Sequence, residues 1–240
     1  MIHYHGTPFG GSRQDAARFL IGRHALVPFS YQDDMPIVAD VCQSFVLDNG
    51  AFTAWTQGKA VDFPGYIAWV REWCRHPNFD WALIPDVIDG TADDNDELLT
   101  MWPREIQGVP VWHMHEPIAR LETLAAQWRT VALGSSGQWA TPGTTAWWAR
   151  MADAMNAICP DGRPVCRLHG LRMLDPLIFT RLPLSSADST NAAVNGGSLS
   201  RFGMYLPPTK AQRSAVIAER IESFNSSATW IYQPEQEFLL

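Results

Sequence analysis

The alternation of strand-like and helix-like segments predicts an α/β fold, a (β/α)8 TIM-like barrel of parallel strands. Short apolar runs alternate with stretches of helical apolar spacing through most of the chain, which is typical of a parallel sheet. Eight strand candidates can be counted, the number that closes such a barrel. An open doubly wound sheet is the alternative, but no GxGxxG motif follows the first strand. At 240 residues, we expect one barrel domain over residues 1–240.

The predicted strands are short segments rich in apolar residues. In chain order they are Ile2–Thr7, His24–Phe29, Ser44–Asp48, Asp80–Asp86, Val109–His115, Thr130–Ser135, Pro164–His169 and Leu184–Asp188. A further apolar run, Ile37–Cys42, precedes the third of these. No clear helix is recognised between Phe29 and Ser44, so the second strand–helix unit is incomplete in the prediction.

The predicted helices have apolar residues at helical spacing and recognisable first turns. Phe63–Cys74 follows Asp62, a residue type that caps helix N-termini. Asp93–Trp102 begins with an acidic turn, and Pro117–Trp128 carries proline in its first turn. The remaining predicted helices are Arg13–Ile21, Thr144–Ile158, Asp175–Arg181 and Thr209–Phe224.

Composition favours a cytoplasmic globular protein. Hydrophobic residues make up 46% and charged residues 18% of the chain. No apolar run approaches the roughly 20 residues of a membrane helix, and the N-terminus lacks the features of a signal peptide, so no membrane partner is expected. The four cysteines include no CxxC pair, which argues against a structural zinc site, and no cofactor is predicted. Oligomeric state stays open.

Charge is distributed unevenly along the chain. The net charge is −7, yet residues 163–220 contain eight Lys and Arg against three Asp and Glu. This stretch is either an ordinary solvated surface or a set of phosphate contacts for nucleic acid. The residues that would make such contacts are Arg167, Arg172, Arg181, Arg201, Lys210 and Arg213.

Polar side chains recur where the predicted strands end. In a barrel of this kind, the active site forms at the carboxyl ends of the strands. A single aspartate there is usually a helix cap, and a single histidine is usually structural. Their recurrence at one structural position predicts a site made from His3, His5, Asp48, Asn49, Gly50, Asp86, His113, His115, Gly134, Ser135, His169 and Asp188.

Two chemistries could use this set, and the first is metal-dependent hydrolysis. The pattern broadly resembles the amidohydrolases, which are barrel metallohydrolases. It departs from that family because no lysine ends the fourth strand and no histidine can be placed at the sixth. In this alternative the zinc or manganese ligands would be His3, His5, His113, His115, His169 and Asp188.

The second chemistry is base exchange by carboxylates, and here three motifs resemble a family. Residues 44–52, SFVLDNGAF, resemble the Asp-Ser-Gly-Gly-Phe segment of the tRNA-guanine transglycosylase superfamily. Residues 167–172, RLHGLR, with Asp188 after them, resemble its seventh strand and nucleophile strand, and residues 133–137, LGSSG, resemble its base-binding turn. The chain is shorter than the tRNA-acting members and lacks their CxCxxC-plus-His zinc module. It therefore looks most like the compact phage relatives that place 7-deazaguanine derivatives into DNA.

The resemblance implies roles for individual residues. Asp188 would be the nucleophile and Asp48 the general acid and base. Asp86 would accept hydrogen bonds from a guanine-like base, and the backbone of Gly134 and Ser135 would donate to its O6. The other expected substrate-binding residues are Asn49, Gly50, Phe52, His113, His115 and His169, with Trp139 as a second candidate for stacking on the base.

The implied partners are nucleic acid, DNA in preference to tRNA, and a 7-deazapurine base. A barrel that only binds a nucleobase, without turnover, is a third class of function that the sequence leaves open.

Overall fold

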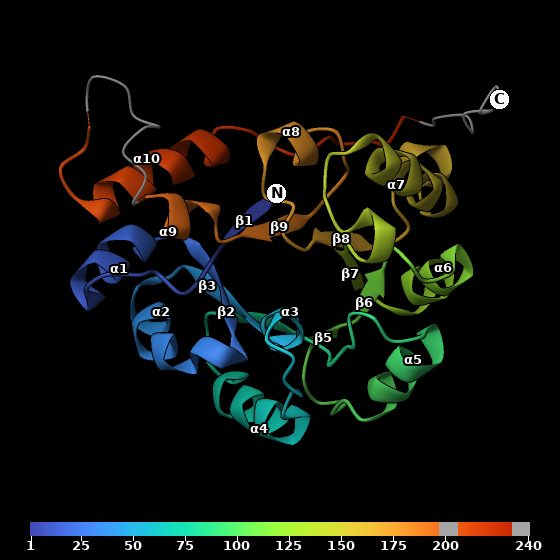
Figure 1. The fold of residues 1–240 in the computed structure, drawn as a ribbon, viewed down its shortest axis with the longest axis horizontal. Helices are drawn as coiled ribbons and strands as arrows, with labels where there is room; N and C mark the ends of the chain where they lie inside the picture. The colour runs from blue at the N-terminus through green and yellow to red at the C-terminus, as the bar shows by residue number, and fades with distance from the viewer. Residues whose placement is uncertain (197–205, 232–240) are drawn as a thin grey trace.

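The computed structural model describes residues 1–196 and 206–231. The sheet is parallel throughout, with the strand order β5-β4-β3-β2-β1-β9-β8-β7-β6, and helices surround it (Figure 1). The described part of the chain contains no helix with the length and apolar character needed to cross a membrane. The strands are β1 Ile2–Gly6, β2 His24–Pro28, β3 Ser44–Asp48, β4 Phe79–Leu83, β5 Gly108–Val109, β6 Val111–His113, β7 Thr130–Gly134, β8 Arg167–Gly170 and β9 Ser186–Ser189.

The two ends of this strand order are parts of one strand. Only Pro110 separates β5 from β6, and proline has no N–H with which to continue the ladder. β5 pairs with β4 and β6 pairs with β7, while the Pro110 carbonyl still accepts a hydrogen bond from the Ala132 N–H. The sheet therefore closes through eight strand positions, and the predicted (β/α)8 barrel is confirmed.

The prediction that no helix lies between Phe29 and Ser44 is wrong. α2 spans Met35–Val41, between Phe29 and Ser44, where no helix was recognised. Its Pro36-Ile37-Val38 sequence has the character of an extended apolar run, yet the buried residues Met35 and Val38 lie three apart, on one helix face. The principal helices are α1 Arg13–Leu20, α2, α4 Phe63–Trp73, α5 Ala92–Thr100, α6 Ile118–Gln127, α7 Thr145–Ile158 and α10 Lys210–Glu222; the short ones are α3 Ala51–Thr56, α8 Pro176–Phe179 and α9 Asn191–Asn195.

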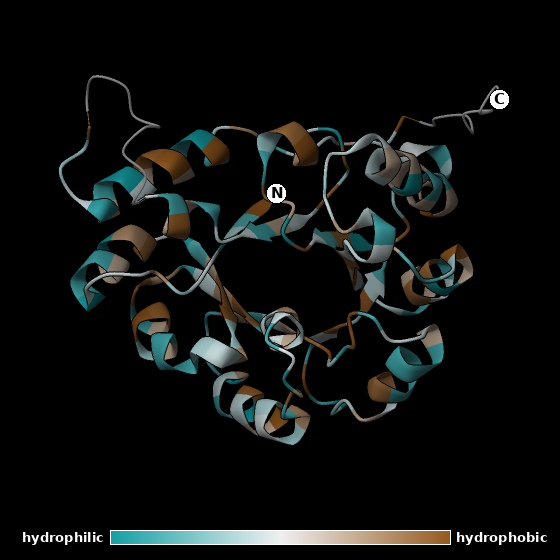
Figure 2. Ribbon diagram, viewed as in Figure 1, coloured by the Kyte–Doolittle hydropathy of each residue, from teal (hydrophilic) through white to brown (hydrophobic). Residues whose placement is uncertain are grey.

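The core has two parts, one inside the barrel and one outside it. Tyr4, Val46, Trp81 and Val111 belong to a small buried cluster of inward-facing strand residues. The larger cluster lies between the strands and the surrounding helices, in which hydrophobic and hydrophilic stretches alternate (Figure 2). Because side chains fill the barrel interior, a ligand site can open only at one of its two ends.

Candidate functional site

A pocket opens at the carboxyl ends of the strands. It contains about 530 Å³ of empty space, open solvent included. Most of the residues predicted for the site meet there, although they come from strands that are far apart in the sequence. The lining residues are Asp48, Asn49, Ala51, Phe52, Leu83, Asp86, Ile88, His113, Gly134, Ser135, Leu171, Arg172 and Asp188.

Asp48 is the last residue of β3, and its environment favours the protonated form. Burial, together with the smaller effect of the nearby charges of Asp86 and Asp188, raises the pKa of this carboxyl from 3.8 to about 7. The Gly50 N–H donates to Asp48 Oδ1 at 3.1 Å, which opposes the shift. Gly50 itself has φ 76°, a left-handed conformation that favours glycine. At neutral pH Asp48 can therefore both give and take a proton.

Asp86 follows β4 and is held by two side chains. Asn49 Nδ2 donates to Asp86 Oδ1 at 2.7 Å, and His113 Nε2 donates to Oδ2 at 2.8 Å. Asn49 also donates to the Ile84 carbonyl and accepts from the Ala51 N–H, so its amide serves to position Asp86. Each carboxylate oxygen keeps lone-pair capacity for donors of a ligand.

Asp188 lies in β9 and has two unequal oxygens. Its Oδ1 accepts a hydrogen bond from the backbone N–H of Arg172 at 2.9 Å. His169 Nε2 lies 3.3 Å from the same oxygen, but without hydrogen-bond geometry. Within residues 1–196 and 206–231, Oδ2 has no hydrogen-bond partner. One oxygen is thus held in place and the other is free to react.

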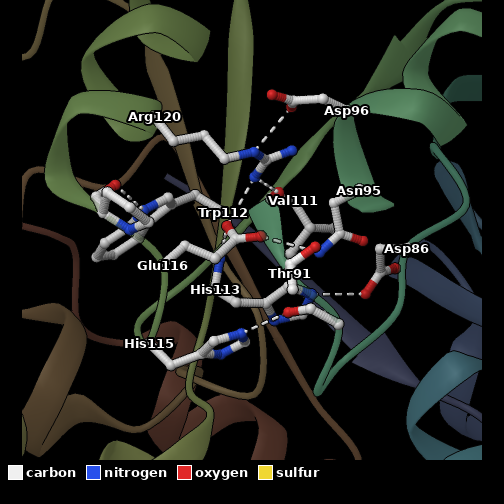
Figure 3. A network of polar contacts seen from close by, with 12 residues as sticks. Asp86, Thr91, Asn95, Asp96, Val111, Trp112, His113, His115, Glu116 and Arg120 are labelled. Carbon is white, nitrogen blue, oxygen red and sulfur yellow. Dashed lines mark hydrogen bonds and ion pairs between the residues drawn. The ribbon is translucent and has the colours of Figure 1, made fainter. Parts of the chain in front are cut away.

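A buried polar network supports the Asp86–His113 pair from behind (Figure 3). Glu116 Oε2 accepts from the His113 N–H at 2.9 Å, and Oε1 accepts from Asn95 Nδ2 at 2.9 Å. Asn95 also accepts from the N–H of Val87, the residue after Asp86, at 2.7 Å. With the His113–Asp86 bond, these contacts form a closed ring.

Arg120 neutralises the buried carboxylate at the centre of this network. Its Nη1 donates to Glu116 Oε2 at 2.7 Å, and its Nε donates to Asp96 Oδ1 at 2.8 Å. Glu116 is 1% and Arg120 7% exposed, so the pair is shielded from solvent. Sequence reasoning missed these residues, although the i,i+4 spacing of Glu116 and Arg120 was a usable signal.

Some predicted site residues lie outside the pocket. His115 stacks on His113, and its ring nitrogens contact Ser136 Oγ at 2.7 Å and the Gly90 carbonyl at 2.9 Å. His169 is fully buried beneath Asp188, 4.8 Å from the Trp81 ring. Gly50 forms the turn below Asp48, and Trp139 packs under the Arg150 guanidinium at 5.0 Å. None of them is among the described residues that line this pocket.

The histidines of the metal-dependent alternative do not converge. Successive residues of a strand point to opposite faces, so His3 and His5 point outward where Tyr4 points into the barrel. His3 contacts the Phe224 carbonyl at 3.1 Å, and His5 contacts Glu222 Oε1 at 2.8 Å. The described residues contain no group of three or more His, Cys, Asp or Glu that could hold a metal ion. The predicted six-residue ligand set is therefore not assembled.

The predicted phosphate contacts that the structure describes are spread over different parts of the molecule. Arg167 begins β8 and so lies at the opposite end of the barrel from Asp188, while Arg181 packs 4.8 Å over the Trp148 ring. Lys210 Nζ donates to the Gly10 carbonyl at 2.6 Å, and Arg213 donates to the carbonyls of Gly196 and Pro207. Arg201 lies outside the described residues.

Among the predicted phosphate contacts that the structure describes, only Arg172 lines the pocket. Its guanidinium lies 4.1 Å from the centroid of the Phe52 ring, which lines the pocket as well.

Comparison with known proteins supports the fold. No family model matches the chain, and no curated protein matches it. Among solved structures, the chain is similar to the tryptophan synthase A-subunit from the hyperthermophile Pyrococcus furiosus, with a TM-score of 0.54 and 13% identity over 93% of this chain and 98% of that one. The tryptophan synthase complex of the same organism gives a TM-score of 0.53 and 12% identity, covering 93% of this chain and 97% of that one. At this identity the likeness shows a shared barrel fold.

Proposed function

We propose that this protein is a base-exchange transglycosylase that replaces guanine in nucleic acid by a 7-deazaguanine derivative. One observation carries the proposal: three aspartates in three different environments line one pocket. Asp188 has one held and one free oxygen, Asp48 has a pKa of about 7, and Asp86 is held as a hydrogen-bond acceptor. These are the properties of a nucleophile, a general acid and base, and a base-recognition group.

In the first step, guanine leaves the sugar. The target nucleotide is extruded from the duplex, because its C1′ cannot be reached in the stack. Asp188 Oδ2 attacks C1′, the C1′–N9 bond breaks, and its electron pair stays on guanine. Protonated Asp48 donates its proton to the departing base. The product is a covalent ester between Asp188 and the sugar.

In the second step, the new base takes the vacated position. Ionised Asp48 removes the N9 proton of the deazapurine, and N9 attacks C1′. The C1′–O bond of the ester breaks, and its electron pair returns to Asp188 as the carboxylate. Two displacements on one carbon retain its configuration, as in retaining glycosidases, with a base in place of water.

Recognition of the base rests on donors and acceptors of the pocket. Asp86 is an acceptor when ionised, which suits the N1–H and 2-amino group of guanine. The backbone of Gly134 and Ser135 would donate to O6. Glycine suits this turn, because a Cβ at Gly134 would lie 3.0 Å from His113 Nδ1. Phe52 lines the pocket, and its ring offers a stacking surface once the Arg172 guanidinium that lies over it is displaced.

DNA is the proposed nucleic acid in preference to tRNA. The preference rests on the resemblance to compact relatives without the zinc module. Arg172, at the pocket, is the cation best situated to meet a phosphate of the flipped nucleotide. Binding to DNA should weaken as salt rises; an affinity that stays flat between low and moderate salt would argue against the nucleic-acid partner.

An exchange assay tests the proposal. Duplex DNA and tRNA, each labelled in guanine, would be incubated with the protein and a 7-deazaguanine derivative, and free labelled guanine measured. We expect release with wild type and none with Asp188→Asn, which keeps an oxygen for the Arg172 N–H and so should fold normally. No release from either nucleic acid, together with base binding, would assign the protein to the class that binds without turnover. Full activity of Asp188→Asn would remove Asp188 as the nucleophile.

A further inference from the structure

The pocket contains a contact that the proposed chemistry does not use. The Arg172 guanidinium lies 4.1 Å from the centroid of the Phe52 ring, so a planar cation covers an aromatic face inside a ligand pocket. Phe52 comes from α3 and Arg172 from the loop after β8, so the contact spans the pocket. Within the described residues, Arg172 forms no ion pair with an acid. Its side chain can therefore leave Phe52 without breaking a salt bridge.

The backbone of Arg172 is held separately from its side chain. Its φ is 59°, a left-handed conformation that is uncommon for residues other than glycine. In this conformation its N–H donates to Asp188 Oδ1 at 2.9 Å. The backbone thus fixes one oxygen of Asp188 while the side chain extends across the pocket. A substitution that changes only the side chain leaves the Asp188 contact in place.

We propose that the Arg172 side chain is a gate that selects for a flipped nucleotide over a free base. The guanidinium covers the face of Phe52 on which a purine would stack, so an entering base and Arg172 compete for one surface. A base attached to nucleic acid brings a phosphate to which the displaced guanidinium can move. A free base brings none. The purine-like nature of the ligand rests on the proposed function, whereas the competition follows from the contact itself.

If Arg172 is such a gate, replacing it should raise the affinity for a free base and lower the affinity for DNA. Arg172→Gln removes the cation that covers Phe52, and a solvent-accessible cation–π contact corresponds to a two- to fivefold change in an equilibrium constant. We therefore expect the variant to bind free 7-deazaguanine about two- to fivefold more tightly than wild type. It should bind a DNA duplex more weakly, with a shallower dependence on salt by about one phosphate contact. General damage to the pocket would instead weaken the binding of both the free base and the DNA duplex.

Two further variants sharpen the test. Arg172→Lys keeps the charge but loses the planar group, so it should bind the free base more tightly while DNA affinity stays closer to wild type. Arg181→Gln is the matched control, because Arg181 also lies over an aromatic ring, Trp148, at 4.8 Å, but does not line the pocket. We expect Arg181→Gln to bind 7-deazaguanine as wild type does.

Calorimetric titration of 7-deazaguanine and fluorescence anisotropy of a labelled duplex at several salt concentrations measure both effects. Tighter base binding with weaker DNA binding in Arg172→Gln supports the gate, even if no base exchange is found. The gate is overturned if Arg172→Gln binds 7-deazaguanine no more tightly than wild type does, or if neither protein binds it. If wild type exchanges guanine but Arg172→Gln binds the base no more tightly, the gate is wrong and the proposed function stands.

Discussion

The raised pKa of Asp48 should make the folded protein less stable at neutral pH and above than at acidic pH. Its pKa rises on folding from 3.8 to about 7, chiefly because the carboxyl is buried. Between these two values the folded protein keeps a proton that the unfolded chain has released. Stability therefore falls as pH rises from about 4 to about 7. Asparagine carries no charge, so the Asp48→Asn variant should not lose stability in this pH range.

The size of the effect follows from the shift. A change of about 3 pKa units at about 1.36 kcal/mol each gives roughly 4 kcal/mol as the upper value. At pH 8, Asp48→Asn should be more stable than wild type by up to that amount, which corresponds to about 8–16 °C in Tm for a chain of this length. At pH 4 the two proteins should be nearly equal. The asparagine oxygen can still accept from the Gly50 N–H.

Urea unfolding at pH 4 and pH 8 measures the difference. The matched control is Asp40→Asn, which removes the same charge from an exposed position on α2 and should change stability little at either pH. Equal stability of Asp48→Asn and wild type at pH 8 would refute the reasoning. A gain in stability of the same size at both pH values would also refute it, because the gain would then not depend on the pKa shift.

Three other predictions concern catalysis and its support. The exchange rate should be highest near pH 7 and fall on both sides, since Asp48 must be protonated when guanine leaves and ionised when the new base arrives; a rate independent of pH between 5 and 9 would contradict this. Glu116→Ala should lower the free energy of unfolding by about 3–5 kcal/mol in urea titrations, because it removes the buried partner of Arg120 and leaves that guanidinium only the exposed carboxylate of Asp96; an unchanged urea midpoint would argue against it. Treatment with EDTA should leave exchange activity intact, whereas loss of activity and rescue by zinc would favour the metal-dependent alternative.

The position of the main carboxylates could be predicted because it depends on topology alone. In an alternating β/α chain the carboxyl ends of parallel strands share one rim. Asp48, Asp86 and Asp188 each lie at or near the end of a predicted strand, and all three line one pocket. The same rule brought His113 to Asp86.

Other residues were misplaced because their positions depend on detail finer than strand order. His3 lies on the same strand as the inward-facing Tyr4, but its side chain points to the opposite face. Arg167 belongs to a basic stretch of sequence, yet it begins its strand and so lies at the far end of the barrel. Charge along a sequence does not predict charge on one surface when the strands run from end to end of the barrel.

The supporting network could not be predicted, since its partners are distant in sequence. Glu116 is bound by Asn95, 21 residues away, and by the backbone of His113. Only the three-dimensional arrangement shows that these contacts brace Asp86. The same holds for the contact of Arg172 with Phe52, which joins the loop after β8 to α3 across the pocket.

Trapping of the covalent intermediate tests the central claim most directly. The protein would be incubated with guanine-containing DNA without an incoming base, denatured, and digested for mass spectrometry. We predict a sugar-linked peptide modified at Asp188, and no adduct with Asp188→Asn. Release of guanine without any adduct, or an adduct on another residue, would contradict the assignment of Asp188 as the nucleophile.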